Sequence, residues 1–300
     1  MKKIFGVCLA VFLMIAGFMQ ESKAGLIFGD GAANLALGAN FPYVGWVESI
    51  DGGNTQFNSS GVLIAPNWVL LSGHQTLAVD SDLNTRHGSL RVGFGSNVFT
   101  NRGENQIASE VFLHPAYKDP QIRDGGLNYD LALLYFESPF ATIAPVQFYV
   151  GGIAVGDSSS IAGYGLFQDV NDPTHSQTLT GNRYAGNNII SSISVPLRPS
   201  YVQTYVCTDQ FSPECQISPQ MGGRVGDSGG PLIINGQVAG VLSRVGGDTN
   251  FINFTQYTRL DNDWINSTIT SVPEPGSMLL LVVCGSIFMC RRYSQAKHLK

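Results

Sequence analysis

Cysteine and charge are both scarce in this sequence. Charged residues account for 13% of the 300 positions, and the five cysteines include Cys8, Cys284 and Cys290 near the two ends. Only Cys207 and Cys215 remain between them, so a fold that depends on a disulfide framework is excluded. In an oxidising compartment we expect these two cysteines to bridge and to stabilise the fold by about 2–3 kcal/mol.

The sequence also lacks metal-ligand spacing and an excess of positive charge. No HExxH pairing or other convincing metal spacing occurs, which disfavours a metalloprotease, and we expect no metal and no cofactor. Residues 25–273 contain ten Lys and Arg against twenty Asp and Glu, a net charge near −10, whereas the whole chain carries −5. Such an acidic domain is a poor partner for nucleic acid. Acidic stretches at 80–82 and 119–124 leave calcium binding as an alternative, although isolated loop acids are usually only solvated.

Long hydrophobic runs are confined to the two ends. Residues 1–24 place Lys2 and Lys3 before an apolar run that ends at Met19, and they close on the small-x-small sequence SKA. This is the pattern of a cleaved signal peptide. We therefore expect export, with an uncleaved membrane anchor as the alternative.

The C-terminal end has three parts. Residues 271–277 form a Ser/Pro linker, 278–290 an apolar run, and 291–300 a basic tail that starts with two arginines. A helix over the apolar run spans about 20 Å, less than the roughly 30 Å hydrocarbon core. The order Pro-Glu-Pro, apolar helix, arginines resembles the PEP-CTERM sorting tail of Gram-negative bacteria. The resemblance implies export from a Gram-negative-type cell and recognition by membrane sorting machinery; an ordinary tail anchor is the alternative.

Between the ends, short apolar runs alternate with turn residues. Examples are FPYVGWVESI at 41–50, GVLIAPNWVLL at 61–71 and PLIINGQVAGVLS at 231–243. Gly, Asn, Asp, Ser and Pro fill the gaps between such runs, as is typical of strands joined by turns. A period of 3.6 appears only in LDNDWINSTI at 260–269. The pattern predicts an all-β domain over residues 25–270, as a barrel or a sandwich, with one C-terminal helix.

Residues 224–232, RVGDSGGPL, are the segment most suggestive of chemistry. A serine between glycines can sit on a tight turn whose N–H groups converge on one point, which is the geometry that holds a developing oxyanion. Gly226 permits a backbone conformation that a side chain resists, and Gly229 and Gly230 allow a substrate to approach closely. Glycine-rich turns that contain serine are common, so the geometry alone does not establish catalysis.

GDSGGP is similar to the nucleophile motif of the trypsin/chymotrypsin-like serine proteases. NWVLLSGHQ at 67–75 resembles the family's histidine segment, and NYDLALLYF at 128–136 resembles its aspartate segment. Three further stretches resemble the family in the same order: VFLHPAY at 111–117, SIAGYG at 160–165, and QYTRL followed by DWI. The resemblance extends from about residue 27 to 269. It implies two six-stranded antiparallel β-barrels with the active site between them and a short C-terminal helix.

The resemblance assigns a role to each site residue. Ser228 would attack the scissile carbonyl, His74 would take its proton, and Asp130 would fix the histidine tautomer. The N–H groups of Gly226 and Ser228 would bind the oxyanion. The protein would then be a serine endopeptidase that acts on protein or peptide substrates, and we expect it to be a monomer.

The sequence departs from the family around the histidine and at the N-terminus. Gln75 stands where the family has a cysteine whose disulfide clamps the histidine loop, which puts the rigidity of that turn in question. In the family, maturation frees an N-terminal ammonium that pairs with the aspartate before the nucleophile. The matching residues are Ile27 and Asp227, so we expect Gly25 and Leu26 to be trimmed after signal cleavage.

The specificity pocket can be placed by the same alignment. Gly222 falls at its floor, and Val245 and Thr255 fall on its walls, where elastase-like members carry bulky residues. This predicts a preference for small or medium apolar residues before the cut bond.

Two other interpretations stay open. The chain could be a catalytically silent member that acts as a surface binding or adhesion module, because the surroundings of His74 are altered. It could also be a structural matrix protein in which the triad residues are incidental. Of the other histidines, His114 precedes a proline and is expected to be structural, and His87 and His175 are expected at the surface.

Overall fold

The computed structural model describes residues 25–27, 31–77, 87–118, 129–169, 177–193, 201–206, 218–247 and 253–272. The segment 1–24, the residues beyond 272, and both Cys207 and Cys215 lie outside these ranges, so the predictions made for them stay predictions. Among the described residues, no helix has the length and apolar character needed to cross a membrane.

Strands are the main secondary structure of the described residues. They are β1 (Gly25–Ile27), β2 (Val44–Asp51), β3 (Asn54–Ala65), β4 (Trp68–Leu71), β5 (Ser89–Gly93), β6 (Asn105–Ile107), β7 (Glu110–Leu113), β8 (Ala132–Tyr135), β9 (Ser158–Gly163), β10 (Phe167–Asp169), β11 (Tyr184–Ile193), β12 (Tyr201–Val206), β13 (Met221–Gly222), β14 (Pro231–Ile234), β15 (Gln237–Gly247) and β16 (Asn253–Arg259). The helices are α2 (Ala32–Gly38) and α3 (Asn262–Ser271), with 3-10 turns η2 (Gly73–Thr76) and η3 (Pro115–Lys118).

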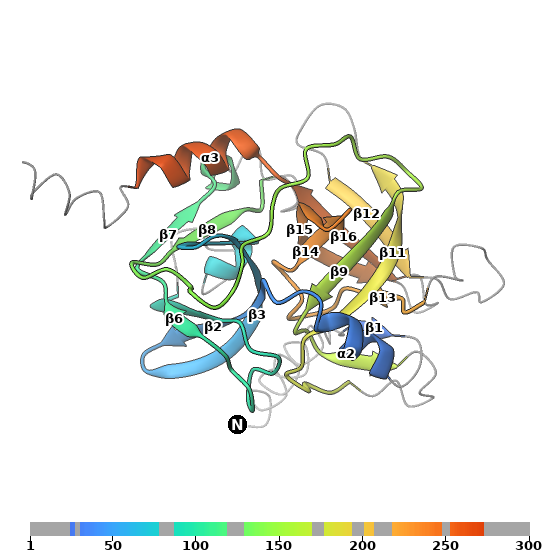
Figure 1. The fold of residues 1–300 in the computed structure, drawn as a ribbon, viewed down its shortest axis with the longest axis horizontal. Coiled ribbons are helices and arrows are strands. Elements are labelled where there is room, and N and C mark those ends of the chain that lie inside the picture. The colour runs from blue at the N-terminus through green and yellow to red at the C-terminus, as the bar shows by residue number, and fades with distance from the viewer. Residues whose placement is uncertain are drawn as a thin grey trace, which may run out of the picture.

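The strands form two curled antiparallel sheets that lie side by side (Figure 1). The N-terminal sheet has the order β6-β5-β2-β3-β4-β8-β7, and the C-terminal one closes as the barrel β11-β12-β16-β15-β14-β9. The predicted all-β architecture of two barrel-like halves is confirmed. The first half has seven strands rather than six because β6 and β7 extend its two edges. The short strands β10, β1 and β13 form a third sheet.

Each half has its own apolar core, and a third cluster joins them. Val47, Leu63 and Leu134 are among the fully buried residues of the first half, and Ile161 and Leu232 are among those of the second. Alternation along each strand places these side chains inward, so burial of their apolar surface stabilises both curled sheets.

The C-terminal helix α3 follows β16 of the second half and lies over β7 and β8 of the first (Figure 1). Asp261 caps it by accepting a hydrogen bond from the Trp264 N–H at 3.0 Å, which satisfies one of the free donors of the first turn. Its inner face packs Trp264 and Ile265 against Trp68 and Leu131. The helix was predicted over 260–269, and its existence is confirmed with a shift of two residues.

A buried polar junction joins the two halves. The Tyr164 hydroxyl lies 2.5 Å from the Gly95 carbonyl oxygen and 3.1 Å from that of Val44. Arg183 donates from Nη1 to the same hydroxyl at 3.0 Å and from Nε to the Gly38 carbonyl at 2.9 Å. Because these groups come from both halves, the junction fixes their relative position.

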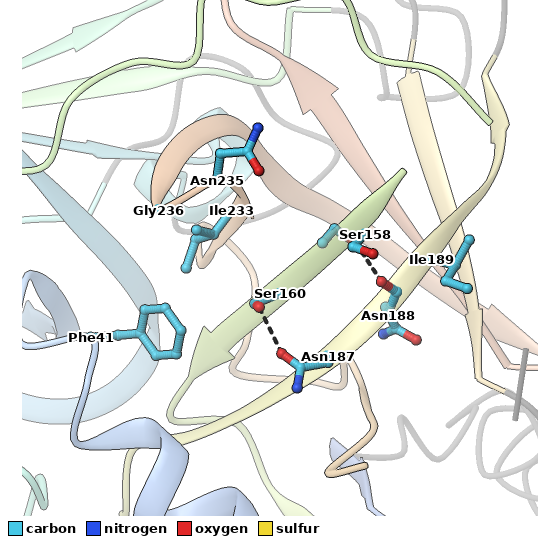
Figure 2. A pocket seen from close by; sticks show the side chains of 10 residues that line it. Phe41, Ser158, Ser160, Asn187, Asn188, Ile189, Ile233, Asn235 and Gly236 are labelled. Carbon is cyan, nitrogen blue, oxygen red and sulfur yellow. Dashed lines mark hydrogen bonds between the residues drawn. The ribbon is translucent and has the colours of Figure 1, made fainter. Parts of the chain in front are cut away.

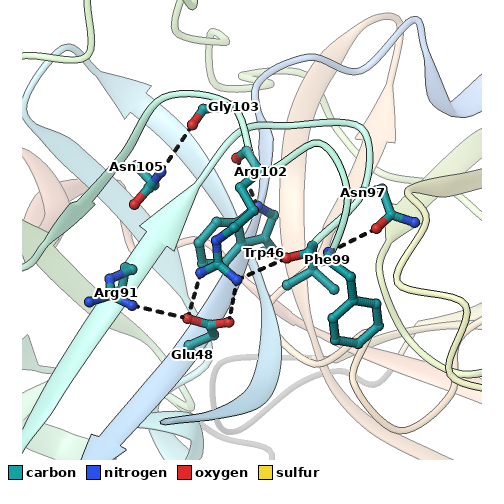
Figure 3. Close-up of polar contacts among 9 residues, drawn as sticks. Trp46, Glu48, Arg91, Asn97, Phe99, Arg102, Gly103 and Asn105 are labelled. Carbon is teal, nitrogen blue, oxygen red and sulfur yellow. Dashed lines mark hydrogen bonds and ion pairs between the residues drawn. The ribbon is translucent and has the colours of Figure 1, made fainter.

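A second cluster fastens the loop 95–103 to the first half (Figure 3). Arg102 forms a two-pronged ion pair with buried Glu48, with distances of 2.9 and 2.7 Å, and its guanidinium lies 4.1 Å from the centre of the Trp46 ring. Arg91 approaches the same carboxylate at 3.5 Å. Two hydrogen bonds to one carboxylate fix the guanidinium plane, so Arg102 anchors the loop.

Candidate active site

The turn that carries His74 begins where β4 ends. Leu77 donates its N–H to the His74 carbonyl at 3.2 Å, and Thr76 Oγ1 donates to the Gly73 carbonyl at 2.8 Å. Gly73 packs so closely that a Cβ there would lie 2.7 Å from Leu113 Cδ1 and 3.2 Å from Asp130 Oδ1. Close packing and local hydrogen bonds therefore hold this turn where the family uses a disulfide clamp.

Asp130 fixes both the backbone and the ring of His74. Its Oδ1 accepts the His74 backbone N–H at 2.8 Å, and its Oδ2 lies 2.7 Å from His74 Nδ1. The carboxylate is fully buried, whereas 19% of the His74 side chain is exposed. Because a carboxylate oxygen accepts hydrogen bonds, we assign His74 Nδ1 as the donor to Asp130 and Nε2 as the ring nitrogen with the lone pair. Tyr129, just before Asp130, has a positive φ of 58°.

Ser243 is a further partner of Asp130 that sequence reasoning missed. Its Oγ donates to Asp130 Oδ2 at 2.5 Å from strand β15, so the second half supplies the hydrogen bond to an aspartate of the first. The two residues are 113 positions apart. No local pattern marks the serine in VLSRVGG, and only the family alignment of that strand could have suggested it.

The serine turn rests on both halves. Ser228 is partly exposed, and its carbonyl accepts the Ser60 N–H at 2.9 Å. Gly229 has φ +79° and donates its N–H to Leu242 O at 2.8 Å. A Cβ on Gly229 would overlap the Ser60 carbonyl oxygen and lie 3.1 Å from the N of Ser72. The turn therefore lies against the residues that directly precede His74.

Asp227 is buried beneath this turn. Its carboxylate accepts the Gly165 N–H at 2.7 Å and the Arg224 N–H at 2.9 Å. A Cβ on Gly163 or Gly165 would meet this carboxylate, which explains the two glycines of SIAGYG. Burial raises the pKa of Asp227 to about 7, although both hydrogen bonds and the charge of Arg224 oppose the rise.

Arg224 and the N-terminal strand lie in the same region. Arg224 is 8% exposed, and its burial lowers the pKa of the guanidinium to about 10, against the opposing effect of Asp227. In the backbone, β1 pairs Ile27 with Met221 and Leu26 with Gly222. Ile27 is therefore placed along the strand that leads into the serine turn.

The three predicted specificity residues come together. Val245 and Thr255 are paired in register on β15 and β16. Thr255 Oγ1 accepts the N–H of Gly223 at 2.9 Å, so the strand end that carries Gly222 is fixed against β16. Thr255 and Gly222 are buried, and Val245 is partly exposed.

Gln75 makes a contact that the sequence did not suggest. Its side-chain nitrogen lies 2.6 Å from His74 Nε2, the ring nitrogen opposite the one that faces Asp130. This is the edge at which a base would take a proton from a serine.

The other described histidines, His87 and His114, contact residues outside the candidate active site. His114 is buried between Tyr129, on which it stacks at 4.5 Å, and Trp264, and its Nε2 lies 3.2 Å from Asp261 Oδ2. Burial lowers the pKa of His114, and Asp261 partly offsets that effect. His87 pairs with Asp51 at 2.6 Å. In the described part of the chain, no three His, Cys, Asp or Glu side chains are grouped to hold a metal ion.

A hollow of about 550 Å³ lies beside strands β9 and β11 and the turn between β14 and β15, and none of the predicted site residues lines it. Figure 2 shows Phe41 facing the strands β9 and β11, where Ser160 donates to Asn187 Oδ1 at 2.8 Å. Its walls consist of hydroxyl, amide and hydrocarbon groups.

A histidine bonded to a buried aspartate beside a GDSGGP turn, on two curled sheets, is the architecture of trypsin-like serine endopeptidases. The fold and site place this hydrolase in that class. The family model described as Trypsin matches residues 37–265. The chain therefore belongs to the trypsin family.

Individual relatives agree with this assignment. Serine protease 1 of Rattus norvegicus is 28% identical over 229 residues, which cover 70% of this chain and 80% of that protein. Trypsin of Saccharopolyspora erythraea is 26% identical over 192 residues, covering 61% and 73%. The structure of mouse neuropsin, a serine protease, matches with a TM-score of 0.54 at 18% identity over 76% of this chain and 95% of that one, a likeness of fold.

Proposed function

We propose that this protein is an exported serine endopeptidase that cuts peptide bonds through an acyl-enzyme on Ser228. The observation that most supports this is the set of hydrogen bonds at the Asp130 carboxylate. It pairs with His74 Nδ1 at 2.7 Å, accepts the His74 backbone N–H at 2.8 Å, and accepts the Ser243 hydroxyl. These contacts orient the imidazole so that Nε2, the ring nitrogen that faces away from Asp130, would transfer the proton.

The proposed reaction has two stages, acylation and deacylation of Ser228. His74 Nε2 takes the Ser228 hydroxyl proton as Oγ attacks the scissile carbonyl, and it returns that proton to the leaving amine. Water then attacks the acyl-enzyme with the same base, which releases the acid product and restores the serine. Asp130 stabilises the imidazolium in both stages of the reaction.

The N–H groups of Gly226 and Ser228 are proposed to bind the oxyanion. Neither N–H donates a hydrogen bond to another described residue, whereas the neighbouring N–H groups of Asp227 and Gly229 donate to Arg224 O and Leu242 O. Each oxyanion donor in such sites contributes on the order of 3 kcal/mol to the transition state.

We propose small or medium apolar residues before the cut bond. Thr255 and Val245 would narrow a pocket whose floor, at Gly222, has no carboxylate to bind Lys or Arg. A peptide library would test this preference, and rapid cleavage after Lys or Arg would contradict it.

We also propose that the chain is exported, sorted at the membrane and trimmed at its N-terminus. Residues 1–24 would direct export from a Gram-negative-type cell, and residues 271–300 would engage membrane sorting machinery. Cys207 and Cys215 would bridge after export, and trimming to Ile27 would give an ammonium for Asp227. An N-terminal sequence of active protein that began at Gly25 would contradict the trimming.

A fluorophosphonate probe tests the activity on the full chain. We expect labelling at Ser228, complete loss of labelling in Ser228→Ala, and a reduction of about 1,000-fold or more in His74→Ala. Mass spectrometry of the labelled peptide identifies the residue. An unlabelled wild-type protein that is folded by circular dichroism would favour the alternative, a silent homologue that acts as a surface binding or adhesion module.

A further inference from the structure

We propose that Gln75 is an autoinhibitory residue whose side-chain amide occupies His74 Nε2 and has to leave it before Ser228 can react. This inference rests on the proposed function, because it assigns Nε2 as the site of proton transfer. It is carried by the 2.6 Å contact between Gln75 Nε2 and His74 Nε2.

The His74 ring has a single lone pair with which to accept a hydrogen bond. His74 Nδ1 donates to Asp130, so the neutral ring has a single lone pair, at Nε2. One lone pair accepts one well-aligned hydrogen bond, and Gln75 donates to it in the structure. The Ser228 hydroxyl needs the same lone pair to lose its proton. Gln75 and Ser228 therefore compete for one atom.

The competition persists if the amide turns over. The Gln75 side-chain oxygen would then accept a hydrogen bond from a protonated Nε2. That proton is the one that the leaving amine must receive. In either orientation the amide engages the nitrogen that has to exchange a proton with the reacting groups.

Gln75 can leave His74 Nε2 by rotation of its side chain while the backbone of the turn stays in place. The backbone of the turn is held by the Gln75 N–H donating to Ser72 O at 3.2 Å and by the bonds of Thr76 and Leu77 described above. Gln75 is partly exposed, so its amide can turn toward solvent without a change in the turn. A substrate entering beside His74 can thus displace the amide.

A purely structural role for Gln75 predicts a different result. If the amide only braced the turn in place of a disulfide, its removal would slow the reaction or leave it unchanged. If it competes with Ser228, its removal makes the serine more reactive. The sign of the rate change distinguishes the two roles.

The experiment measures the second-order rate constant for fluorophosphonate labelling of the full chain. Gln75→Met keeps the length of the side chain and removes its hydrogen bonding, with Gln75→Ala as a second variant should Gln75→Met fold poorly. We expect labelling about fivefold faster, the change that corresponds to a hydrogen bond of about 1 kcal/mol. Gln75→Glu should react more slowly than wild type at neutral pH, because a carboxylate holds a proton on Nε2. Gln147→Met, at an exposed glutamine, should change nothing.

The outcomes separate the inference from the proposed function. Wild type labelled at Ser228 with no acceleration in Gln75→Met or Gln75→Ala overturns the autoinhibitory role and leaves the enzyme assignment intact. Absence of Ser228 labelling in every variant overturns the proposed function instead. In the Ser228→Ala background, ¹⁵N NMR of His74 should show a shifted Nε2 resonance in Gln75→Met, and an unchanged resonance would exclude the contact.

Discussion

Burial alters the ionisation of Asp227, a residue that supports the serine turn. Its pKa rises to about 7 because the carboxylate is removed from water, and Arg224 and two backbone N–H groups only partly oppose this. A carboxyl whose pKa is raised by folding binds its proton more tightly in the folded state. Its contribution to stability is therefore largest at low pH and is lost as pH rises from about 4 to 7.

Asp227→Asn should remove that pH dependence. We expect the difference in the free energy of unfolding, wild type minus variant, to fall by on the order of 2–4 kcal/mol between pH 4 and pH 8. Urea unfolding of the untrimmed chain at both pH values, with Ser228→Ala in both proteins to prevent self-cleavage, measures this difference.

Asp51 provides a control of opposite sign. The Gly88 N–H and His87 lower its pKa, so its stabilising effect is present at neutral pH and is lost on acidification. The corresponding difference for Asp51→Asn should therefore rise with pH, and only slightly, because the side chain is 46% exposed. A difference for Asp227→Asn that stays constant from pH 4 to pH 8 would show that Asp227 ionises normally.

The sequence predicted individual site residues only where a short motif contains them. GDSGGP and the segments around His74 and Asp130 predicted a site, and the structure brings His74 and Asp130 together. The contacts of Ser243 and Gln75 could not be predicted in this way. The first joins residues 113 positions apart, and the second depends on how a side chain turns back on its neighbour.

At the scale of elements, two turn glycines test how closely the two halves meet. Gly229 and Gly236 both have positive φ, +79° and +77°. A Cβ on Gly236 meets nothing within 4 Å, whereas one on Gly229 overlaps the backbone of Ser60. Alanine at either position costs about 1 kcal/mol of backbone strain, and only at Gly229 does it also force β3 and the serine turn apart.

We therefore expect Gly236→Ala to lower the free energy of unfolding by about 1 kcal/mol and Gly229→Ala by about 3 kcal/mol or more. Gly229→Ala should also abolish probe labelling, and Gly236→Ala should preserve it. Urea denaturation and labelling of the same preparations provide both readouts. Equal losses of stability in the two variants would mean that the serine turn has room that the structure does not show.

Elements with a clear apolar pattern were predicted, and those with mixed patterns were not. The runs at 41–50, 61–71 and 231–243 became β2 to β4, β14 and β15. Strand β11 was missed because its inward-facing Asn188, which bonds to Met221 O and Gln220, interrupts the apolar alternation. Helix α2, with seven residues, is too short to show a helical period.

At the scale of the whole molecule, the site exists only if the two halves keep their relative position. His74 and Asp130 belong to the first half, and Ser228 and Ser243 belong to the second. The junction of Tyr164 with Arg183 lies between the two halves. Burial raises the pKa of Tyr164 to about 12, so its hydroxyl stays protonated and able to donate.

Tyr164→Phe should weaken this junction without changing the shape of the ring. The substitution removes the hydrogen bonds of the hydroxyl to the Gly95 carbonyl and to Arg183 Nη1. Loss of a partner by such buried groups lowers the free energy of unfolding by about 1–3 kcal/mol. Because the same junction aligns the site residues of the two halves, kcat/KM on a peptide substrate should fall several-fold under conditions where the variant is folded. Tyr149→Phe, which removes an exposed hydrogen bond to Gly152 O, is the matched control and should change neither quantity by much. Lost stability with unchanged kcat/KM would show that the two halves are aligned by their apolar contacts rather than by this junction.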